Sequence, residues 1–147
     1  TIVLEESPHD PSRRSRLWSL KDIDRVMTKN KGSDVLEVIH LQSSTPYDSN
    51  WDPEVFTMIC NLRILIIAYD VHLPHGLKCL PSSLKILEWK SYPLNYLPSG
   101  GNLDQLGVLK MHHSKIEQLW KRTHVRKLCF LLIKHTFFSP FCKTCLC

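Results

Sequence analysis

The chain has 147 residues, of which 43% are hydrophobic and 22% charged, which suits one modest globular domain and excludes a mainly disordered protein. Its formal net charge is +5, but residues 121–147 alone hold six basic and no acidic residues. Residues 1–120 hold 13 basic and 14 acidic residues, so the overall charge does not indicate binding of nucleic acid.

The sequence also predicts where the protein resides. No apolar run reaches the roughly 18 residues of a membrane-spanning helix, so we expect no membrane span. The chain starts at Thr1, and Glu5 and Glu6 lie where a secretory signal peptide would need positive charge. The six cysteines are unevenly spaced, unlike those of a disulfide framework. Together these features predict a reduced protein of the cytoplasm, or of the nucleus and the cytoplasm.

Residues 1–33 are predicted to form a polar, turn-rich junction with one short helix. Two prolines exclude a regular helix from the first part of this segment. Ser19 lies three residues before Asp22, a spacing similar to that of a capping box, and apolar residues then follow at helical spacing until Gly32. We therefore predict a helix over about residues 20–30, with Gly32 as its stop signal.

A strand and a second helix are predicted before the repeats begin. Apolar residues within 35–41 indicate a strand. Asp52 followed by Pro53 is typical of a helix start, with the aspartate as N-cap and the proline in the first turn. This helix is expected to continue to about Cys60.

From residue 62 onward the sequence repeats with a period of 22. The pattern L-x-x-L-x-L begins at Leu62, Leu84 and Leu106, within the range of periods typical of leucine-rich repeats. Each unit is predicted to form one short strand, whose leucines point into the stack, and a return segment with Leu-Pro turns. The predicted fold class is therefore α/β, a short leucine-rich-repeat solenoid of parallel strands after a helical, turn-rich junction.

The residues that alternate with the buried leucines are predicted to face outward on the concave side of this solenoid. They form the surface to which we assign protein binding, although contact with a neighbouring domain of the same protein would explain the pattern equally well. The candidate residues are Ile64, Ile66, Ala68, Ile86, Glu88, Lys90, Val108, Lys110 and His112.

No pattern in the sequence predicts a catalytic site. Neither a nucleophile elbow G-x-S-x-G nor a phosphate loop G-x-x-x-x-G-K-[ST] is present. We therefore expect no enzymatic activity, no cofactor and no metal. The tryptophans are predicted to pack in the interior; they are Trp18, Trp51, Trp89 and Trp120.

The tail over residues 124–147 differs in composition from the repeats. Its motif C-x-x-C-x-C ends at Cys147, near His135, but structural zinc sites usually pair two spaced clusters, so no zinc site is predicted. Two basic pairs follow Trp120 without the aromatic residues of a single-strand-binding surface, so no nucleic-acid partner is expected. A basic, cysteine-rich protein that binds nucleic acid or metal remains the alternative interpretation.

Some apolar residues of the tail keep the 22-residue phase, but the tail is so apolar that this is weak evidence for another repeat. Our hypothesis is that the tail is translated intron or a frame error, which would make the chain a truncated and non-functional gene product. Because three repeats are close to the minimum for a stable stack, we also expect marginal stability and some self-association. The tail residues in phase are Leu128, Leu131, Ile133, Phe138 and Phe141.

Several blocks of this sequence resemble a known family. The stretches IVLEESP and PSRRSRLW within residues 2–18 look like the end of the nucleotide-binding region of plant disease-resistance proteins. The subclass in question carries a Toll/interleukin-1-receptor-like domain, a nucleotide-binding domain and leucine-rich repeats. The stretches NLRIL at 61–65, LKILEW at 84–89 and LKMHHSKIEQLW at 109–120 are similar to its repeats.

The resemblance covers residues 2–123 and implies a non-catalytic protein-interaction segment of an innate immune receptor in plant defence signalling. It implies a junction over 1–33, the first leucine-rich repeats over 34–123 and an atypical tail over 124–147. The implied partner is a pathogen effector, a host protein that the receptor guards, or the receptor's own nucleotide-binding domain, which is held inactive by the contact. The family's nucleotide-contacting and Toll-like motifs do not occur in this sequence, so ATP or NAD chemistry is not implied for it.

Overall fold

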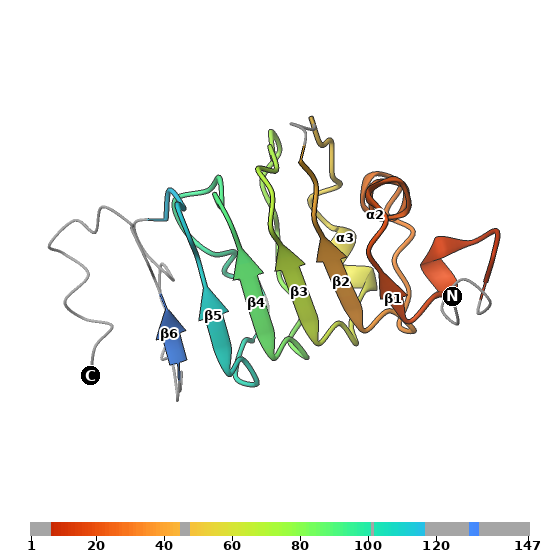
Figure 1. The fold of residues 1–147 in the computed structure, drawn as a ribbon. Helices are drawn as coiled ribbons and strands as arrows, with labels where there is room; N and C mark the ends of the chain where they lie inside the picture. The colour runs from red at the N-terminus through yellow and green to blue at the C-terminus, as the bar shows by residue number, and fades with distance from the viewer. Residues whose placement is uncertain (1–6, 45–47, 101, 117–129, 133–147) are drawn as a thin grey trace, which may run out of the picture.

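The computed structural model describes residues 7–44, 48–100 and 102–116, together with the backbone of 130–132 (Figure 1). Within these residues, six strands form one parallel sheet and follow one another in chain order. Short helical segments and loops connect the strands. The strands are β1 (Arg16–Leu17), β2 (Val38–Leu41), β3 (Ile64–Ile67), β4 (Ile86–Trp89), β5 (Val108–Lys110) and β6 (Phe130–Leu132). The helical segments are the 3₁₀ turn η1 (Pro11–Arg13), α2 (Leu20–Thr28) and α3 (Val55–Met58).

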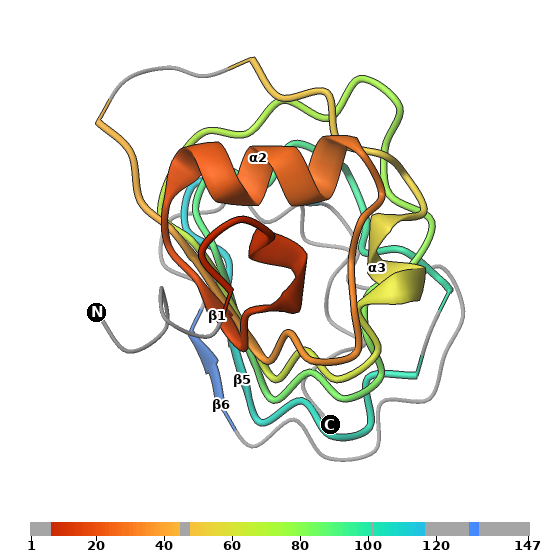
Figure 2. The ribbon, with the colours of Figure 1, turned by 90° about the vertical axis from the view of Figure 1, so that its right-hand side faces the viewer.

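Each strand and its return segment make one turn of a coil. In the view along the stack, the strands lie on one side of the coil, while α2, α3 and the connecting loops form the other sides (Figure 2). This arrangement confirms the predicted α/β solenoid of parallel strands. One face of the sheet therefore covers the interior of the coil, and the other face points away from it.

The register of the sheet follows the 22-residue period of the sequence. Leu65 pairs with Leu87, and Leu87 pairs with Leu109, so equivalent residues of successive repeats lie side by side. The step from β2 to β3 is longer, because Ile39 pairs with Leu65, 26 residues further along the chain. The backbone of β6 pairs with β5 in the 22-residue register. The interpretation of the tail as translated intron nevertheless stays a prediction.

The interior of the coil is filled by the strand residues that alternate with the outward-facing ones. In β3 and β4 these are Leu65, Ile67, Leu87 and Trp89, and each has 0% of its surface exposed. Burying one such side chain contributes about 1.5–3 kcal/mol. A single repeat has too few of these side chains to fold alone, so stacking of neighbours stabilises the coil.

An aromatic cluster fills the interior next to β4. The ring centroids of Trp51 and Trp89 are 6.0 Å apart, and Tyr92 packs edge-on against Trp89 at 5.1 Å. Burial raises the pKa of the Tyr92 phenol, which stays protonated and donates to the backbone carbonyl of Tyr96 at 3.1 Å. The prediction that Trp51 and Trp89 pack inside is thus confirmed. For Trp18 it is wrong, because half of this side chain is exposed, and Trp120 lies outside the described residues.

The helix predicted over residues 20–30 is α2, but its caps differ from the expectation. Ser19 occupies the N-cap position without a capping hydrogen bond from its side chain. At the other end, Asn30 adopts the left-handed conformation with φ 47°, and the Lys31 N–H donates to the carbonyl of Val26 at 3.2 Å. Gly32, the predicted stop signal, is needed for close packing instead. A Cβ at this position would lie only 2.3 Å from Cγ1 of Ile59.

The second predicted helix is shorter than its sequence indicated. Asp52 does act at its start, since its carboxylate accepts a hydrogen bond from the Glu54 N–H at 2.7 Å. The helix α3 then extends for a single turn and ends before Ile59, which turns into the core. The strand predicted over 35–41 is also shorter, because only Val38–Leu41 pairs with neighbouring strands.

Residues 7–17 close the end of the coil beside α2, a role that the sequence did not predict. The strand β1 pairs with β2, and η1 lies across the open end of the stack (Figures 1 and 2). Pro11 is buried in this contact. The division between a junction and the repeats at residue 33 stays a prediction, although the sheet itself begins at Arg16.

The buried guanidinium of Arg14 holds this segment in place. Its Nε donates to the carbonyl of Ser7 at 2.8 Å, and one Nη donates to the carbonyl of Pro8 at 3.0 Å. The other Nη donates to the carboxylate of Asp22 on α2, also at 2.8 Å. Asp22 therefore binds the N-terminal segment instead of closing a capping box with Ser19.

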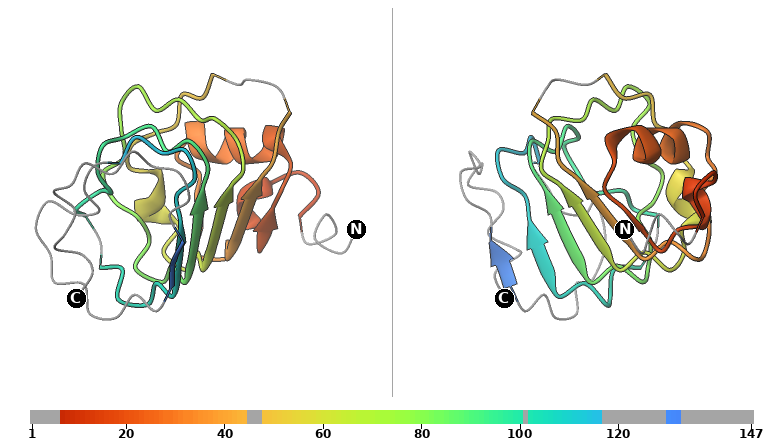
Figure 3. Two further views of the ribbon diagram at one scale, coloured as in Figure 1. Left: turned by 60° about the vertical axis from the view of Figure 1, so that its left-hand side comes forward. Right: turned by 45° about the vertical axis from the view of Figure 1, so that its right-hand side comes forward.

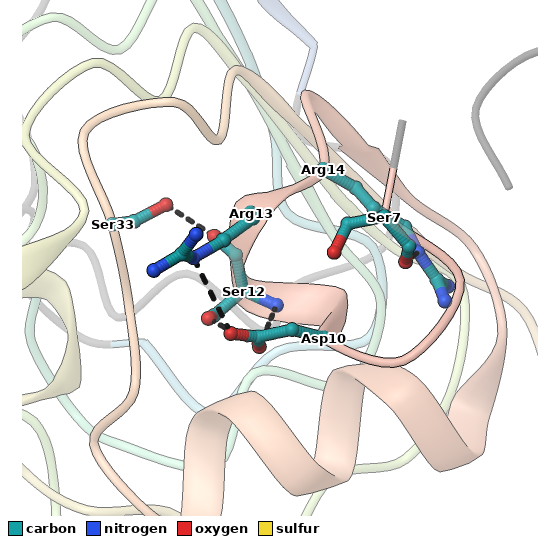
Figure 4. A network of polar contacts seen from close by, with 6 residues as sticks. All are labelled: Ser7, Asp10, Ser12, Arg13, Arg14 and Ser33. Carbon is teal, nitrogen blue, oxygen red and sulfur yellow. Dashed lines mark hydrogen bonds and ion pairs between the residues drawn. The ribbon is translucent and has the colours of Figure 1, made fainter. Parts of the chain in front are cut away.

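A second polar network fixes η1 (Figure 4). The carboxylate of Asp10 accepts hydrogen bonds from the hydroxyl of Ser12 at 2.6 Å and from its backbone N–H at 3.2 Å. Arg13 lies 3.6 Å from the same carboxylate. The hydroxyl of Ser33 donates to the carbonyl of Ser12, which ties η1 to the segment that follows α2.

Candidate protein-binding face

The face of the sheet that points away from the coil is called the open face here. It comprises the outward residues of β1–β5 and the partly or fully exposed residues that lie one or two positions after these strands. Neither α2 nor α3 covers this face, since both lie on the other sides of the coil (Figure 3). Within the described residues, the open face presents side chains of several parallel strands together, which makes it the candidate binding surface.

The structure places six of the nine predicted binding residues at outward positions of three adjacent strands. The remaining three follow the strand ends directly or two residues later, at the carboxyl edge of the sheet. All nine are partly or fully exposed, whereas their neighbours within the strands are buried. The strand positions are Ile64, Ile66, Ile86, Glu88, Val108 and Lys110, and the edge positions are Ala68, Lys90 and His112.

The register aligns these side chains into rows that run across the strands. One row is aliphatic and consists of Val38, Ile64, Ile86 and Val108, each paired with the next. Adjacent strands lie about 4.8 Å apart, so such neighbours form one continuous apolar strip. All four are only half-buried, which leaves the strip accessible to another protein.

The second row is polar toward β5. Glu88 and Lys110 pair across β4 and β5, and their charged groups lie 3.2 Å apart. Their side chains are 31% and 36% exposed, so this ion pair adds little to stability. Its effect is to neutralise the one carboxylate among the predicted residues.

The part of the open face that β1 and β2 contribute was not predicted from the sequence. Arg16 and His40 are exposed there, Val38 is half-buried, and Trp18 follows β1 with 50% of its surface exposed. A signal for β1 did exist, because Leu17 precedes its partner Ile39 by the same 22 residues as in later repeats. The longer step to β3 interrupts that period, so the first repeats are out of phase with the rest.

The described residues offer little else for chemistry. Burial raises the pKa of the Cys79 thiol, so this cysteine is protonated and weakly nucleophilic at neutral pH.

A cavity of about 190 Å³ lies beside η1 and α2, where Arg25 and Lys31 face it together with Asp10. Within the described ranges, no three His, Cys, Asp or Glu residues lie close enough to hold a metal ion. The cysteine motif and the basic pairs of the tail lie outside these ranges.

The described part of the chain contains no helix with the length and apolar character needed to cross a membrane.

Comparisons with known proteins place the chain among related sequences. A family model described as Leucine Rich Repeat matches residues 108–123. Disease resistance protein RPP2A of Arabidopsis thaliana is 38% identical over 92% of this chain, and Protein SUPPRESSOR OF npr1-1, CONSTITUTIVE 1 is 35% identical over 80% of it. Disease resistance protein TAO1 is 33% identical over 81% of the chain; these two relatives are also from Arabidopsis thaliana. No solved structure gives a significant match.

These relatives are much longer than this chain, which covers 11%, 8% and 11% of their respective lengths. They confirm the resemblance to plant disease-resistance proteins that the sequence indicated. The repeat match overlaps β5, whose neighbours in the sheet carry the same pattern. The chain therefore has the fold of a leucine-rich-repeat segment and is similar in sequence to plant disease resistance proteins.

Proposed function

We propose that this chain is a non-catalytic protein-interaction segment of plant defence and that its open face makes the contact. The observation that carries the proposal is the half-exposed aliphatic row of Val38, Ile64, Ile86 and Val108. A sheet face that contacts only solvent normally carries polar side chains. A continuous apolar strip is instead typical of an interaction surface. We further propose that the protein acts in the cytoplasm.

The partner is proposed in two forms. In one, the open face contacts the receptor's own nucleotide-binding domain and keeps it inactive; in the other, it recognises a pathogen effector. Both forms require that a partner covers the aliphatic row, so both are tested by the same substitutions. A guarded host protein would act in the same way as an effector.

The test for the first form is co-precipitation of the chain with an RPP2A polypeptide that lacks the segment similar to this chain. We expect the unsubstituted chain to bind and Ile86→Glu to abolish binding, because the carboxylate would be buried in an apolar contact. The matched control is Met58→Glu, which places the same charge at a residue of α3 with 52% exposure. The control should bind like the unsubstituted chain.

Circular dichroism of both variants checks that they remain folded. Binding that Ile86→Glu leaves unchanged would contradict the open face as the contact surface. Absence of binding by the unsubstituted chain would contradict contact with the receptor itself, and effector recognition would then be the form to test with the same two variants.

A further inference from the structure

The open face carries a distinct patch at its N-terminal end, formed by Arg16, Trp18, Val38 and His40. We propose that this N-terminal patch is the main anchor of the open face and docks a protein segment in which acidic side chains flank an apolar one. The inference rests on the proposed function, because it names the chemistry of the partner that the open face takes.

Trp18 is the first reason to place the anchor here. It has 50% of its surface exposed, whereas Trp51 and Trp89 are buried at 2% and 0%. The β1–β2 register, continued by one residue past Leu17, sets Trp18 opposite His40. Trp18 thus begins, at the edge of the sheet, the row of the open face that continues through His40 and lies beside the apolar strip.

A single exposed apolar residue is ordinary, but an exposed tryptophan beside an aliphatic row is not. Val38 and Ile64 pair in the row next to Trp18 and are both half-buried. Tryptophan is strongly enriched among the residues that dominate binding energy, especially where neighbours exclude water around it. The patch therefore offers an apolar side chain of a partner a larger contact than the β5 end does.

Charge is the second reason. Arg16 is exposed at the end of the aliphatic row, next to Val38, and forms no ion pair with the described residues. His40 is exposed in the row that Trp18 begins. The outward positions of β1, β2 and β3 include no acidic residue. The acid further along the face, Glu88, is already paired with Lys110.

These two features together select the partner. A guanidinium binds a carboxylate through two parallel hydrogen bonds, which gives Arg16 a geometric preference for aspartate or glutamate. The aliphatic row beside it requires an apolar side chain on the same segment. A basic segment would be repelled by Arg16, and a purely acidic segment would leave Trp18 and Val38 in contact with water.

The test measures binding of fluorescent peptides to the full chain by anisotropy. The probe is a short peptide that alternates leucine with glutamate, and its twin carries lysine in place of glutamate. We expect the glutamate peptide to bind at least about tenfold more tightly than the lysine peptide. Equal affinity, or tighter binding of the lysine peptide, would overturn the proposal. Tighter binding of a labelled single-stranded oligonucleotide than of the glutamate peptide would overturn it in favour of nucleic acid.

Two variants locate the binding on the patch. Trp18→Ala should weaken the affinity for the glutamate peptide by about thirtyfold, and Arg16→Ala should weaken it by about tenfold. The matched controls are Tyr96→Ala, an aromatic residue with 42% exposure on the return segment after β4, and Arg13→Ala, whose side chain is 78% exposed on η1. The controls should change the affinity by less than about twofold. Loss of binding in the controls alone, or no loss in Trp18→Ala and Arg16→Ala, would contradict the assignment.

The same variants separate this inference from the proposed function. If the Ile86→Glu variant no longer binds the RPP2A polypeptide but the Trp18→Ala variant still does, the open face is the contact surface but the N-terminal patch is not its anchor. If the glutamate peptide binds through Trp18 while Ile86→Glu leaves the RPP2A contact intact, the patch stands and the proposed function fails.

Discussion

At the scale of single residues, the N-terminal end of the coil depends on Arg14. Its guanidinium is almost fully buried and serves two backbone carbonyls and the carboxylate of Asp22. A buried cation is tolerated only when it is paired and hydrogen-bonded in this way. The network joins residues 7–14 to α2, so one side chain connects the segment that covers the end of the coil to the first repeat.

Replacement of Arg14 should therefore destabilise the fold. Arg14→Ala removes three hydrogen bonds and leaves Asp22 without its cation, so we expect a loss of about 2–4 kcal/mol in the free energy of unfolding. Arg14→Lys keeps the positive charge but not the planar guanidinium with its several N–H donors, so it should restore only part of the lost free energy of unfolding. Arg13→Ala is the control and should change stability by less than about 0.5 kcal/mol. Urea denaturation measures all three; an Arg14→Ala variant as stable as the control would contradict the role of the network.

Asp10 makes the same segment sensitive to acid. The hydroxyl hydrogen bond from Ser12 is the main reason that the pKa of Asp10 is lowered, with further help from the Ser12 N–H and from Arg13. A carboxyl with a lower pKa in the folded state stabilises the fold above its unfolded pKa, and this contribution is lost as the pH falls through the folded value. Asp10→Asn should therefore lose less stability than the unsubstituted chain between about pH 5 and pH 2. Thermal unfolding across that range tests this, and identical pH profiles would contradict it.

At the scale of elements, each strand divides its residues between the core and the open face. In β4, Leu87 points into the coil with no exposed surface, whereas Ile86 is only half-buried on the open face. The same division recurs in β3 and β5 at the positions that pair with these two residues. The pattern L-x-x-L-x-L predicts this division because side chains alternate along a strand.

This division predicts unequal effects of the same substitution at neighbouring positions. Leu87→Ala should lower the free energy of unfolding by about 2–5 kcal/mol, because it leaves a cavity in the core. Ile86→Ala should lower it by less than about 1.5 kcal/mol, since solvent already reaches that side chain. Chemical denaturation of both variants measures the two losses in the free energy of unfolding. Similar losses at the two positions would show that the register is shifted by one residue.

Elements without the repeat pattern were harder to predict from the sequence. The helix α2 was found because its apolar residues recur at helical spacing, but Asn30 rather than Gly32 adopts the left-handed conformation at its end. Gly32 is required by the approach of Ile59, and Ile59 belongs to another repeat, so no local signal shows it. The two-residue strand β1 is too short to show alternation and depends on its pairing with β2.

At the scale of the whole molecule, the sequence predicted the central part of the open face but not its N-terminal end. Ile64, Ile86 and Val108 were predicted together because the 22-residue period fixes which residues share a row. Trp18 was assigned to the core, since a large apolar residue is usually buried unless its register position is known. That Trp18 belongs to the open face follows only from the pairing of β1 with β2.

The most direct test of the account is site-specific photo-cross-linking in the complex with the RPP2A polypeptide that lacks the similar segment. A benzophenone amino acid is placed at Ile86, in the aliphatic row of the open face, or at Met58, on α3 and away from that face. We predict a cross-link to the partner from position 86 and none from position 58. Cross-linking from position 58 alone would contradict the claim that the open face of this leucine-rich-repeat coil is its protein-binding surface.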